Sequence, residues 1–312
     1  MKSAFKIEVN GKDITAKINK DTSSIVFKDE SGTISDEITL NIEGAFKKPK
    51  YEDEIKLWIG EEKDLFYCGI FKVQSPTQKY GTSEMMRITA TSTNFSSNLK
   101  VKRNQSYEAL SIFDIGNIIS KRYELELVCD VKDIYVLHQE QTNESDLHFL
   151  KRLAGYYNLL FTIKNNKIIL KKRIKNDKKS DSLPRYKISK DECESVSIEN
   201  TNKTIYGSCK AVWHDTKENK QMSVNVGSGE PIKYIKNSFE SVADAKTKAQ
   251  ATLQKANSGT KVGTITKYGQ TVYAGGILEL SDTVDDNGEY EIESVEHTVD
   301  DNGWNISMEI KN

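Results

Sequence analysis

Cysteine and histidine are the residue types that bind metals most readily, and this chain has four of each. The cysteines, Cys68, Cys129, Cys193 and Cys209, lie far apart without a CxxC pair, so their spacing predicts neither a zinc site nor a disulfide framework. We interpret them as buried, reduced thiols. The histidines, at positions 138, 148, 214 and 297, form no HxxxH or HExxH pair. We therefore expect no metal centre and no cofactor.

Motifs for nucleophilic or phosphate chemistry are absent from the sequence. A nucleophile elbow needs GxSxG and a phosphate cradle needs GxxxxGK[ST], and neither occurs. The close glycines, Gly227 with Gly229 and Gly275 with Gly276, are typical of tight turns. With 46 acidic residues scattered along the chain, a carboxylate pair for glycoside hydrolysis cannot be located. We expect no enzyme, and hydrolysis stays open as an alternative.

Two Asp-Asp-Asn-Gly segments, at 285–288 and 300–303, offer oxygen ligands for calcium. An EF-hand loop also needs a ligand at every second position and a glutamate at the twelfth, and neither segment meets that pattern. Asn-Gly between alternating strands favours a hairpin turn. We interpret both segments as turns.

Composition excludes several classes of protein. The chain has 312 residues, 45 basic against 46 acidic, for a net charge of −1. Such a balance argues against DNA or anionic lipid as the main partner, so we expect no sequence-specific nucleic acid. No run approaches the roughly 18 apolar residues of a membrane span, and no apolar signal block follows the N-terminus. We expect no membrane insertion and a chain that starts in the cytoplasm.

The first unit, residues 1–103, reads as successive strands. Apolar residues alternate with polar ones in Phe5, Ile7 and Val9, and Asn10-Gly11 is a strong hairpin turn. Further alternating runs lie at 38–42, 55–59, 71–73 and 88–90. Short strands at close spacing predict a small antiparallel β-barrel or sandwich.

The second unit, residues 104–190, changes to helical spacing. Ser111 and Asp114 resemble a capping box before a helix, and Ser145 caps a second helix that ends near Gly155. A hairpin follows at 159–170, and a polar linker runs from Lys171 to Lys190. The basic stretch here could contact phosphates or an acidic partner, but a solvated hairpin edge is the reading we favour. Its residues are Lys164, Lys167, Lys171, Lys172, Arg173, Lys175, Lys178 and Lys179.

The third unit, residues 191–312, returns to strands and contains one helix. Ser241 caps that helix with Asp244 three residues on, and its alanine-rich face predicts close packing on a sheet. Two segments, Gly69 to Ser75 and Gly288 to Ser294, share the pattern Gly-x-aromatic-x-aliphatic-x-Ser before a turn and a final strand. Either this is chance alternation, or the chain holds two copies of one β-barrel around a mixed insert. A true repeat predicts that residues 55–95 and 278–310 have the same hairpin topology.

The order of residues around the second helix is more specific than helical spacing requires. It resembles the "ESD-x-x-FL-x-RLA" segment of the phage late control D family, the tail hub proteins of contractile phages and the hub portion of type VI secretion spikes. The matching residues are Asn143, Glu144, Ser145, Asp146, Phe149, Leu150, Arg152, Leu153 and Ala154. Looser family features are Ser35-Asp36, a tyrosine-led helix from Ser106 and the pattern from Gly275 to His297. Asp53-Glu54 departs from the usual Gly-Asp.

The resemblance implies a mainly β protein in which two tube-like β-barrels flank a small α+β domain. It implies a structural hub, a homotrimer whose duplicated barrels adapt a sixfold tail tube to a threefold spike. Its partners would be the tail tube protein, the trimeric spike protein and other baseplate proteins, in a virion assembled in the host cytoplasm. The alternatives are a tail-tip cell-wall hydrolase, or the hub of a secretion or bacteriocin-like injector.

Overall fold

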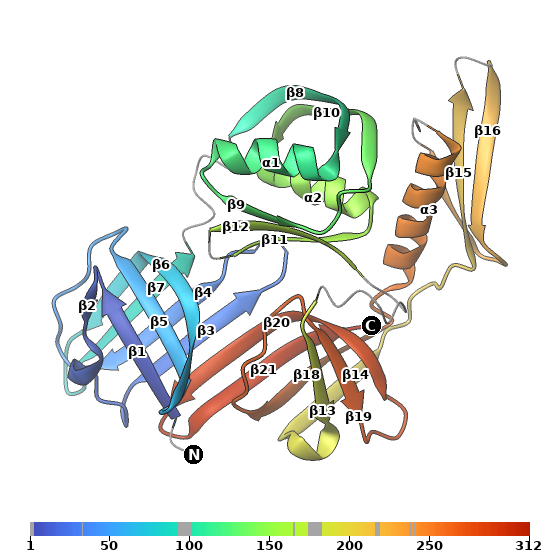
Figure 1. Cartoon of the computed structure of the whole chain (residues 1–312). Helices are drawn as coiled ribbons and strands as arrows, with labels where there is room; N and C mark the ends of the chain where they lie inside the picture. Colours follow the sequence, from blue (N-terminus) through green and yellow to red (C-terminus); the bar gives the residue numbers. More distant parts are fainter. Residues whose placement is uncertain are drawn as a thin grey trace.

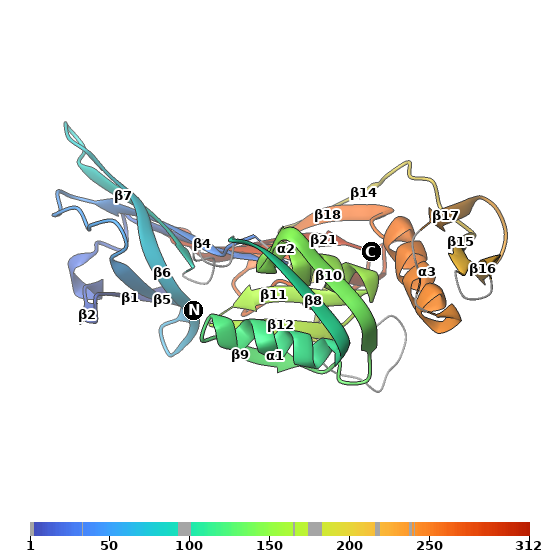
Figure 2. The same cartoon turned by 90° about the horizontal axis from the view of Figure 1, so that it is seen from above.

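The computed structural model describes residues 3–32, 34–92, 101–164, 166–173, 183–215, 219–236, 239 and 241–312. These residues form a mainly β protein with three α-helices (Figure 1). A long sheet runs across the molecule, an α+β unit lies against it, and a small sheet with one helix extends from the far end (Figures 1 and 2). No helix among these residues is long and apolar enough to cross a membrane.

The first β unit supplies one half of the long sheet. Its strands pair in the order β3-β4-β7-β6-β5-β1-β2. Alternation explains the strands: in β4, for example, Ile38, Leu40 and Ile42 point into the core and the residues between them do not. The bounds are β1 Ser3–Val9, β2 Lys12–Asp13, β3 Ser24–Glu30, β4 Glu37–Glu43, β5 Glu54–Glu61, β6 Asp64–Lys79 and β7 Met85–Ser92.

The second β unit supplies the other half, with β13 beside β19 and then the order β19-β20-β21-β18-β14. The bounds are β13 Arg185–Ser189, β14 Ser195–Asn200, β18 Lys261–Tyr268, β19 Ile277–Ser281, β20 Gly288–Asp300 and β21 Gly303–Lys311. The expected linker from Lys171 to Lys190 is wrong in part, because it contains the end of β12 and all of β13. Tyr186 and Ile188 alternate with exposed residues there, which is enough for a strand.

The two β units are not separate barrels. Strand β20 pairs with β19 over its first residues and with β3 of the first unit over Ser294 to Val299. This pairing joins both units into one 13-stranded sheet, and no closed barrel forms within the described ranges. The physical reason is the length of β20: its 13 residues extend beyond the 5 of β19, and β3 supplies the missing hydrogen-bond partners.

The two β units have the same topology. The six strands β1, β3, β4, β5, β6 and β7 correspond in chain order to β13, β14, β18, β19, β20 and β21, and they pair in the same spatial order. Both long strands bulge at the same place, between Val73 and Ser75 in β6 and between Ile292 and Ser294 in β20. The predicted shared hairpin topology is confirmed. One difference is that β1 runs antiparallel to β5 whereas β13 runs parallel to β19.

The α+β unit places two helices between two small sheets (Figure 1). Helices α1 and α2 contact both sheets, β8 with β10 on one side and β11-β12-β9 on the other. Both predicted caps are confirmed: Ser111 Oγ accepts the amide of Asp114 at 3.1 Å, and Ser145 Oγ accepts that of His148 at 3.3 Å. The bounds are β8 Lys102–Ser111, α1 Ile112–Arg122, β9 Glu126–Cys129, β10 Tyr135–Ser145, α2 Asp146–Tyr156, β11 Leu159–Lys164 and β12 Lys167–Lys172.

A third group of strands forms a sheet of its own. Strands β15 Ser208–Asp215, β16 Lys220–Gly227 and β17 Ile232–Lys236 carry helix α3 Val242–Asn257. Ala245 and Ala249 of α3 are fully buried against Cys209 and Ala211 of β15. The predicted close packing of the alanine face is confirmed. The small side chains of alanine let the helix lie close to the sheet.

Candidate functional site

The segment from Asn143 to Ala154 spans the end of β10 and most of α2. Asn143 adopts a left-handed conformation with φ of +48°, which asparagine tolerates better than most residues, and its amide donates to Asn104 Oδ1 at 2.6 Å. This turn lies at the irregularity between Gln141 and Glu144 in the β8–β10 pair. After this turn the chain enters the interior of the unit, where Ser145 and Asp146 are buried.

Asp146 is the most enclosed charge of this segment, with none of its side chain exposed. Its carboxylate accepts hydrogen bonds from Arg122 Nη1 at 2.6 Å, from Gln141 Nε2 at 2.8 Å and from the Tyr123 hydroxyl. Burial raises the pKa of Asp146, whereas these hydrogen bonds and the charge of Arg122 lower it. The lowering effects together are larger, so the pKa of Asp146 is below its usual value. Arg103 Nε lies 3.3 Å from the same carboxylate. The ionised carboxylate thus connects β8, α1, β10 and α2.

A second ion pair fixes the other side of α2. Arg152 Nε lies 3.2 Å and Nη2 lies 2.7 Å from the carboxylate of Glu144, a bidentate geometry. Nη2 also donates to the carbonyl of Glu140 at 2.8 Å. The guanidinium lies 5.4 Å from the Phe149 ring centroid. Arg152 therefore fastens α2 to β10.

The apolar members of the segment form the core of the α+β unit. Phe149, Leu150, Leu153 and Ala154 are all buried in one hydrophobic cluster. The Phe149 ring stacks on Tyr107 of β8 with centroids 5.0 Å apart. The structure brings all nine signature residues together, and the hydrogen bonds, ion pairs and ring contacts described above lie within the α+β unit. This geometry positions helices and strands; none of these contacts resembles a nucleophile with its base.

A junction outside the signature connects the α+β unit to the long sheet. Lys164, at the end of β11, reaches Asp29 in β3, with its Nζ hydrogen-bonded to Oδ1. The same Nζ lies 3.8 Å from Asp36 Oδ1. Asp29 Oδ2 also accepts the amide of Ala274 at 2.7 Å, so one carboxylate connects three segments. We call Asp29, Asp36 and Lys164 the junction triad.

The triad corrects the solvated-edge interpretation of the basic stretch. Only 16% of the Lys164 side chain is exposed, against 43% for Lys167 on the next strand. Arg173 also pairs inward, with Glu291 of β20, whereas Lys167 and Lys172 form exposed pairs with Glu126 and Asp133. Alternation marks Lys164 only as the last residue of an apolar strand, so no sequence signal identified its partners. Lys175, Lys178 and Lys179 lie outside the described residues.

Burial and the neighbouring charge of Asp29 raise the pKa of Asp36 to about 7, although Lys164 opposes the shift. Between the unfolded value of 3.8 and about 7, the folded chain binds a proton that the unfolded chain has released. Asp36 therefore stabilises the fold below pH 4, and that stabilisation is lost as the pH rises through 7.

We expect the Asp36→Asn variant to lose less stability than the unsubstituted chain between pH 5 and pH 8. Only about two pH units of this range lie below the folded pKa, so the difference between the two proteins is at most about 3 kcal/mol. The check is urea unfolding of both proteins at both pH values. His297 titrates in both proteins, so its contribution cancels in the difference. Equal pH dependence in the two proteins would contradict the assignment.

His297 lies at the centre of the joint between the two β units. It pairs in register with Phe27 across β20 and β3, and the two rings stack at 5.7 Å. Nε2 lies 3.1 Å from the Val272 carbonyl and Nδ1 accepts from Trp304 Nε1 at 3.3 Å, which fixes the neutral tautomer with the proton on Nε2. Burial lowers the pKa of His297 to about 4. It is an uncharged part of the core, not a metal ligand.

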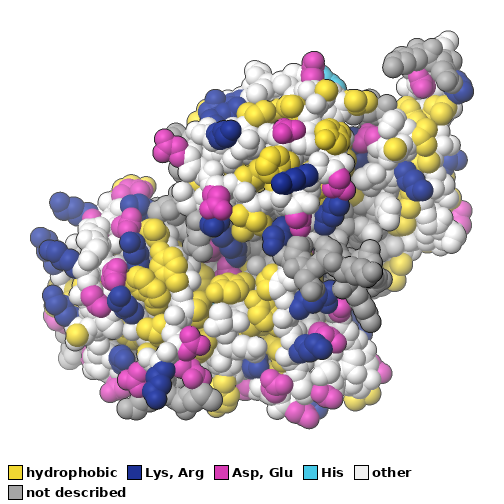
Figure 3. Space-filling view, in the orientation of Figure 1, with side chains coloured by type: hydrophobic (Ala, Val, Ile, Leu, Met, Phe, Trp, Pro, Cys, Tyr) yellow, Lys and Arg dark blue, Asp and Glu magenta, His cyan; other side chains and the backbone are white. Residues whose placement is uncertain are grey.

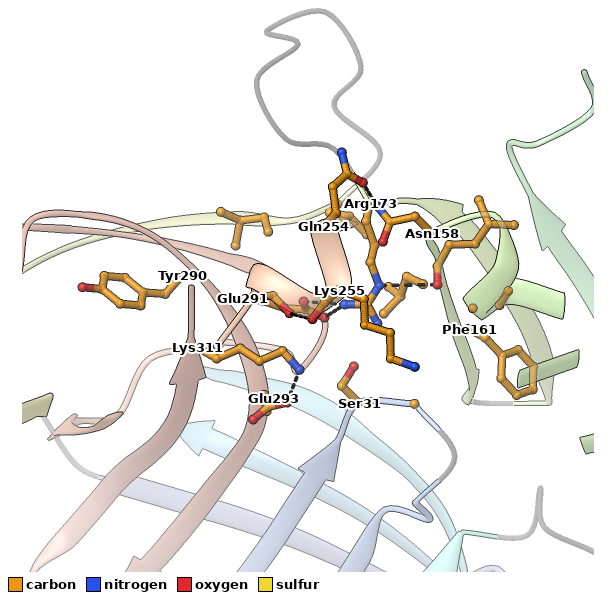
Figure 4. A pocket seen from close by; sticks show the side chains of 18 of the residues that line it. Ser31, Asn158, Phe161, Arg173, Gln254, Lys255, Tyr290, Glu291, Glu293 and Lys311 are labelled. Carbon is orange, nitrogen blue, oxygen red and sulfur yellow. Dashed lines mark hydrogen bonds and ion pairs between the residues drawn. The ribbon is translucent and has the colours of Figure 1, made fainter. Parts of the chain in front are cut away.

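A hollow of about 510 Å³ lies where the α+β unit, α3 and the second β unit meet (Figure 4). Its charged walls pair with one another: Arg173 with Glu291, and Lys311 with Glu293. Asn158 Nδ2 donates to Gln254 Oε1 at 2.6 Å, which ties the end of α2 to α3 across the hollow. Two ion pairs and one hydrogen bond therefore join the walls of the hollow.

Other candidate chemistry from the sequence is explained by local structure. All four cysteines are free, and burial raises the pKa of each thiol. Asp300 and Gly303 close the two-residue turn between β20 and β21. Asn287 Oδ1 accepts the amide of Thr283 at 2.9 Å. Within the described part of the chain, no group of three acidic, cysteine or histidine residues could hold a metal ion.

The surface carries mixed charge. Figure 3 shows basic and acidic side chains interspersed over the face drawn, without a large region of one sign. Apolar side chains appear between them in several small groups. The face drawn therefore lacks the extended basic region that a nucleic-acid groove needs.

Solved structures with the same fold include tail proteins and a component of a type VI secretion system. A 43 kDa tail protein of prophage MuSo2 from Shewanella oneidensis has a TM-score of 0.73 at 12% identity, covering 99% of this chain and 98% of its own. A tail protein from Neisseria meningitidis MC58 also has a TM-score of 0.73, at 11% identity, covering 100% of this chain and 97% of its own. A type VI secretion component from E. coli is more distant, with a TM-score of 0.56 at 9% identity; the match covers 98% of this chain and 76% of its own.

Sequence comparisons identify the family. The probable baseplate hub protein of Escherichia phage 186 is 25% identical over 230 residues, which cover 72% of this chain and 59% of the relative. That of Escherichia phage P2 is 23% identical over 223 residues, 69% of this chain and 57% of the relative. The chain thus spans less than two thirds of these relatives. The family model for the phage tail baseplate hub (GPD) matches residues 100–303, and the chain belongs to that family.

Proposed function

We propose that this chain is a structural hub subunit of the baseplate of a contractile phage tail or of a related injection machine. Three copies form a ring, one face of which meets the hexameric tail tube while the other meets a trimeric spike. Other baseplate proteins surround it in the virion, after assembly in the host cytoplasm. Its action is geometric and requires no chemical reaction.

The duplicated β unit is the observation that carries this proposal. Two units with the same strand order and the same bulge lie side by side in one sheet. Three chains then present six equivalent units, which match a sixfold tube, while the ring itself keeps threefold symmetry for the spike. In the assembled ring, the two β units serve as the tube-like domains. The boundaries near residues 103 and 190 separate them from the α+β domain.

The signature residues have a structural role in this proposal. Asp146, Glu144 and Arg152 hold α2 against β8, β10 and α1, and the apolar members fill the core. The α+β unit is thereby rigid enough to keep a fixed position on the sheet through the junction triad.

The test is reconstitution from purified components. The chain is mixed with the tail tube protein and the spike protein of the same particle, and complexes are examined by light scattering and electron microscopy. We expect a trimer that binds the tube on one side and the spike on the other. A monomer that binds neither partner contradicts the proposal. Reproducible clearing of purified cell wall by this chain in a zymogram, lost on mutation of an acidic pair, would favour the hydrolase instead.

A further inference from the structure

The joint between the two β units shows how one unit attaches to the next. Along one edge, β20 pairs first with β19 of its own unit and then with β3 of the other unit. In that second part, Lys28 lies opposite Glu296 and Phe27 opposite His297. The joint is therefore a strand pairing with a defined register, supported by the stacked rings.

Among the described residues, the same long strand in the first unit has no such second partner. Strand β6 pairs with β5 from Asp64 to Lys72, and from Ser75 to Lys79 the only pairing that the described residues provide is with β7 on the other edge. The equivalence of β6 and β20 extends to the backbone: Val73 exchanges two hydrogen bonds with Glu52 and Asp53, both of 3.0 Å. Ile292 exchanges the same two with Gly275 and Gly276, at 2.8 and 3.0 Å.

The strand that corresponds to β3 is also open. Within the described ranges β14 pairs only with β18, and it ends the path of the long sheet. It lies at the far end of that sheet from β6 and β7 (Figures 1 and 2). In the part of the chain that the structure describes, one molecule thus has an unpaired donor strand at one end and an unpaired acceptor edge at the other, which fits a head-to-tail contact.

We propose that β14 of one subunit pairs with the second half of β6 of the next, repeating between chains the joint that β3 and β20 form within one chain. The partner is a second copy of this chain, and the inference rests on the proposed ring of three. Two or three subunits joined head to tail in an open chain still have one unpaired edge at each end. These two edges pair with each other when three subunits close into a ring.

The register follows from the ladder of paired residues. Starting at the equivalent residues Lys72 and Glu291, one row crosses the first unit and the other crosses the second. In each row, every residue is the paired neighbour of the one before it on the next strand of the sheet. The first row, from β6 to β3, is Lys72, Thr91, Glu37 and Lys28. The second row, from β20 to β14, is Glu291, Lys311, Val262 and Glu199. Glu199 is therefore the counterpart of Lys28, and Thr77 is the counterpart of Glu296. Thr77 of one subunit lies opposite Glu199 of its neighbour, and Lys79 lies opposite Ser197.

Charge and chemistry agree with this register. Lys79 and Glu199 are both exposed, and they become diagonal neighbours across the pairing, within reach of an ion pair. Pro76, in the same part of β6, lacks an N–H, so the ladder has one hydrogen bond fewer than a regular one. Proline on an open edge also prevents indiscriminate strand addition, so the contact selects a partner with complementary side chains.

Engineered disulfides test the register. Cα atoms of directly opposite residues in an antiparallel pair lie about 4.5–5.5 Å apart, which suits a disulfide. We expect the full chain carrying Thr77→Cys and Glu199→Cys to form covalent trimers on oxidation, seen on a non-reducing gel. Either substitution alone can link at most two chains.

Two matched controls accompany this variant. Thr77→Cys with Ser195→Cys uses the same strands and an exposed position four residues away, about 13 Å along β14, which is too far for a disulfide. Lys28→Cys with Glu296→Cys places the pair at the equivalent joint within one chain and should form an intramolecular bond. That second variant shows that the geometry of the joint permits a disulfide.

Light scattering of each variant before oxidation measures its oligomeric state. This measurement tests the proposed trimer separately from the proposed pairing of β14 with β6. Covalent trimers from Thr77→Cys/Glu199→Cys but not from the shifted pair support the pairing. A trimer in solution that does not cross-link at this pair overturns the pairing and leaves the ring intact. If the chain stays monomeric at every concentration, the proposal that copies of this chain pair through β14 and β6 is wrong.

Discussion

Replacing Lys164 by methionine is expected to destabilise the protein by about 3–5 kcal/mol, because it leaves two buried carboxylates without their cation. Asp29 is 2% and Asp36 is 10% exposed, so water cannot replace the ammonium group. Methionine has nearly the same length as lysine, so the loss measures charge rather than packing. Urea unfolding monitored by circular dichroism at pH 8 gives the difference.

A matched control lies on the same hairpin. Lys167→Met removes a lysine whose side chain is 43% exposed and whose partner Glu126 is 62% exposed, so we expect less than about 1 kcal/mol. Adding Asp29→Asn to Lys164→Met removes one of the uncompensated charges and should restore part of the loss. Similar losses for both lysine variants, or no recovery in the double variant, would show that the triad is not a coupled unit.

Asp146→Ala is expected to have the second large effect, a loss of about 3–5 kcal/mol confined to the α+β unit. Arg122, Tyr123 and Gln141 all direct donors at this one carboxylate, and its removal takes that acceptor from all three. Arg122 keeps its hydrogen bond to Gln105 and Gln141 keeps its bond to the Glu144 carbonyl, but the buried negative charge that holds them together is lost. Native-state hydrogen exchange of amides in α1 and α2 measures the loss locally. Amides in β4 and β7 should keep their protection.

Asp133→Ala is the control for a carboxylate in the same unit. Its pair with Lys172 is exposed on both sides, 69% for Asp133 and 44% for Lys172, so the expected loss is below about 1 kcal/mol. Asp146→Asn should fall between the two, because the amide still accepts hydrogen bonds but carries no charge. Unchanged exchange in α1 and α2 of Asp146→Ala would falsify the view that this carboxylate anchors the signature segment.

The elements that could be predicted from sequence are those with a strong local signal. Ser111, Ser145 and Ser241 each cap a helix where the pattern placed one, since capping depends on residues three apart. The alternating strands and the Asn10-Gly11 turn were likewise predictable, because both depend on neighbours in the chain. Strands β8 and β10 were missed, because polar residues dominate them and they form a sheet of only two strands. The helix expected from Ser106 is wrong for the same reason: Ser106 lies in β8, and α1 begins only at Ile112.

The joint and the triad could not be predicted, because alternation indicates which face of a strand is buried but not which strand lies beside it. Lys164 and Asp29 are separated by 135 residues, and Asp29 and Ala274 by 245. The two barrels predicted from sequence illustrate the same limit: the strands and their repetition were visible, whereas the pairing of β20 with β3, which merges them, was not.

The pairing of β3 with β20 also has a consequence for synthesis on the ribosome. Strand β3 is complete by residue 30, but the strand that covers its second edge begins at residue 288. Throughout most of translation the nascent first unit exposes an edge rich in β-branched and aromatic residues, which invites aggregation. Formation of such distant contacts is also slow. We therefore expect chains truncated before β20 to require chaperones far more than chains that contain β20 and β21.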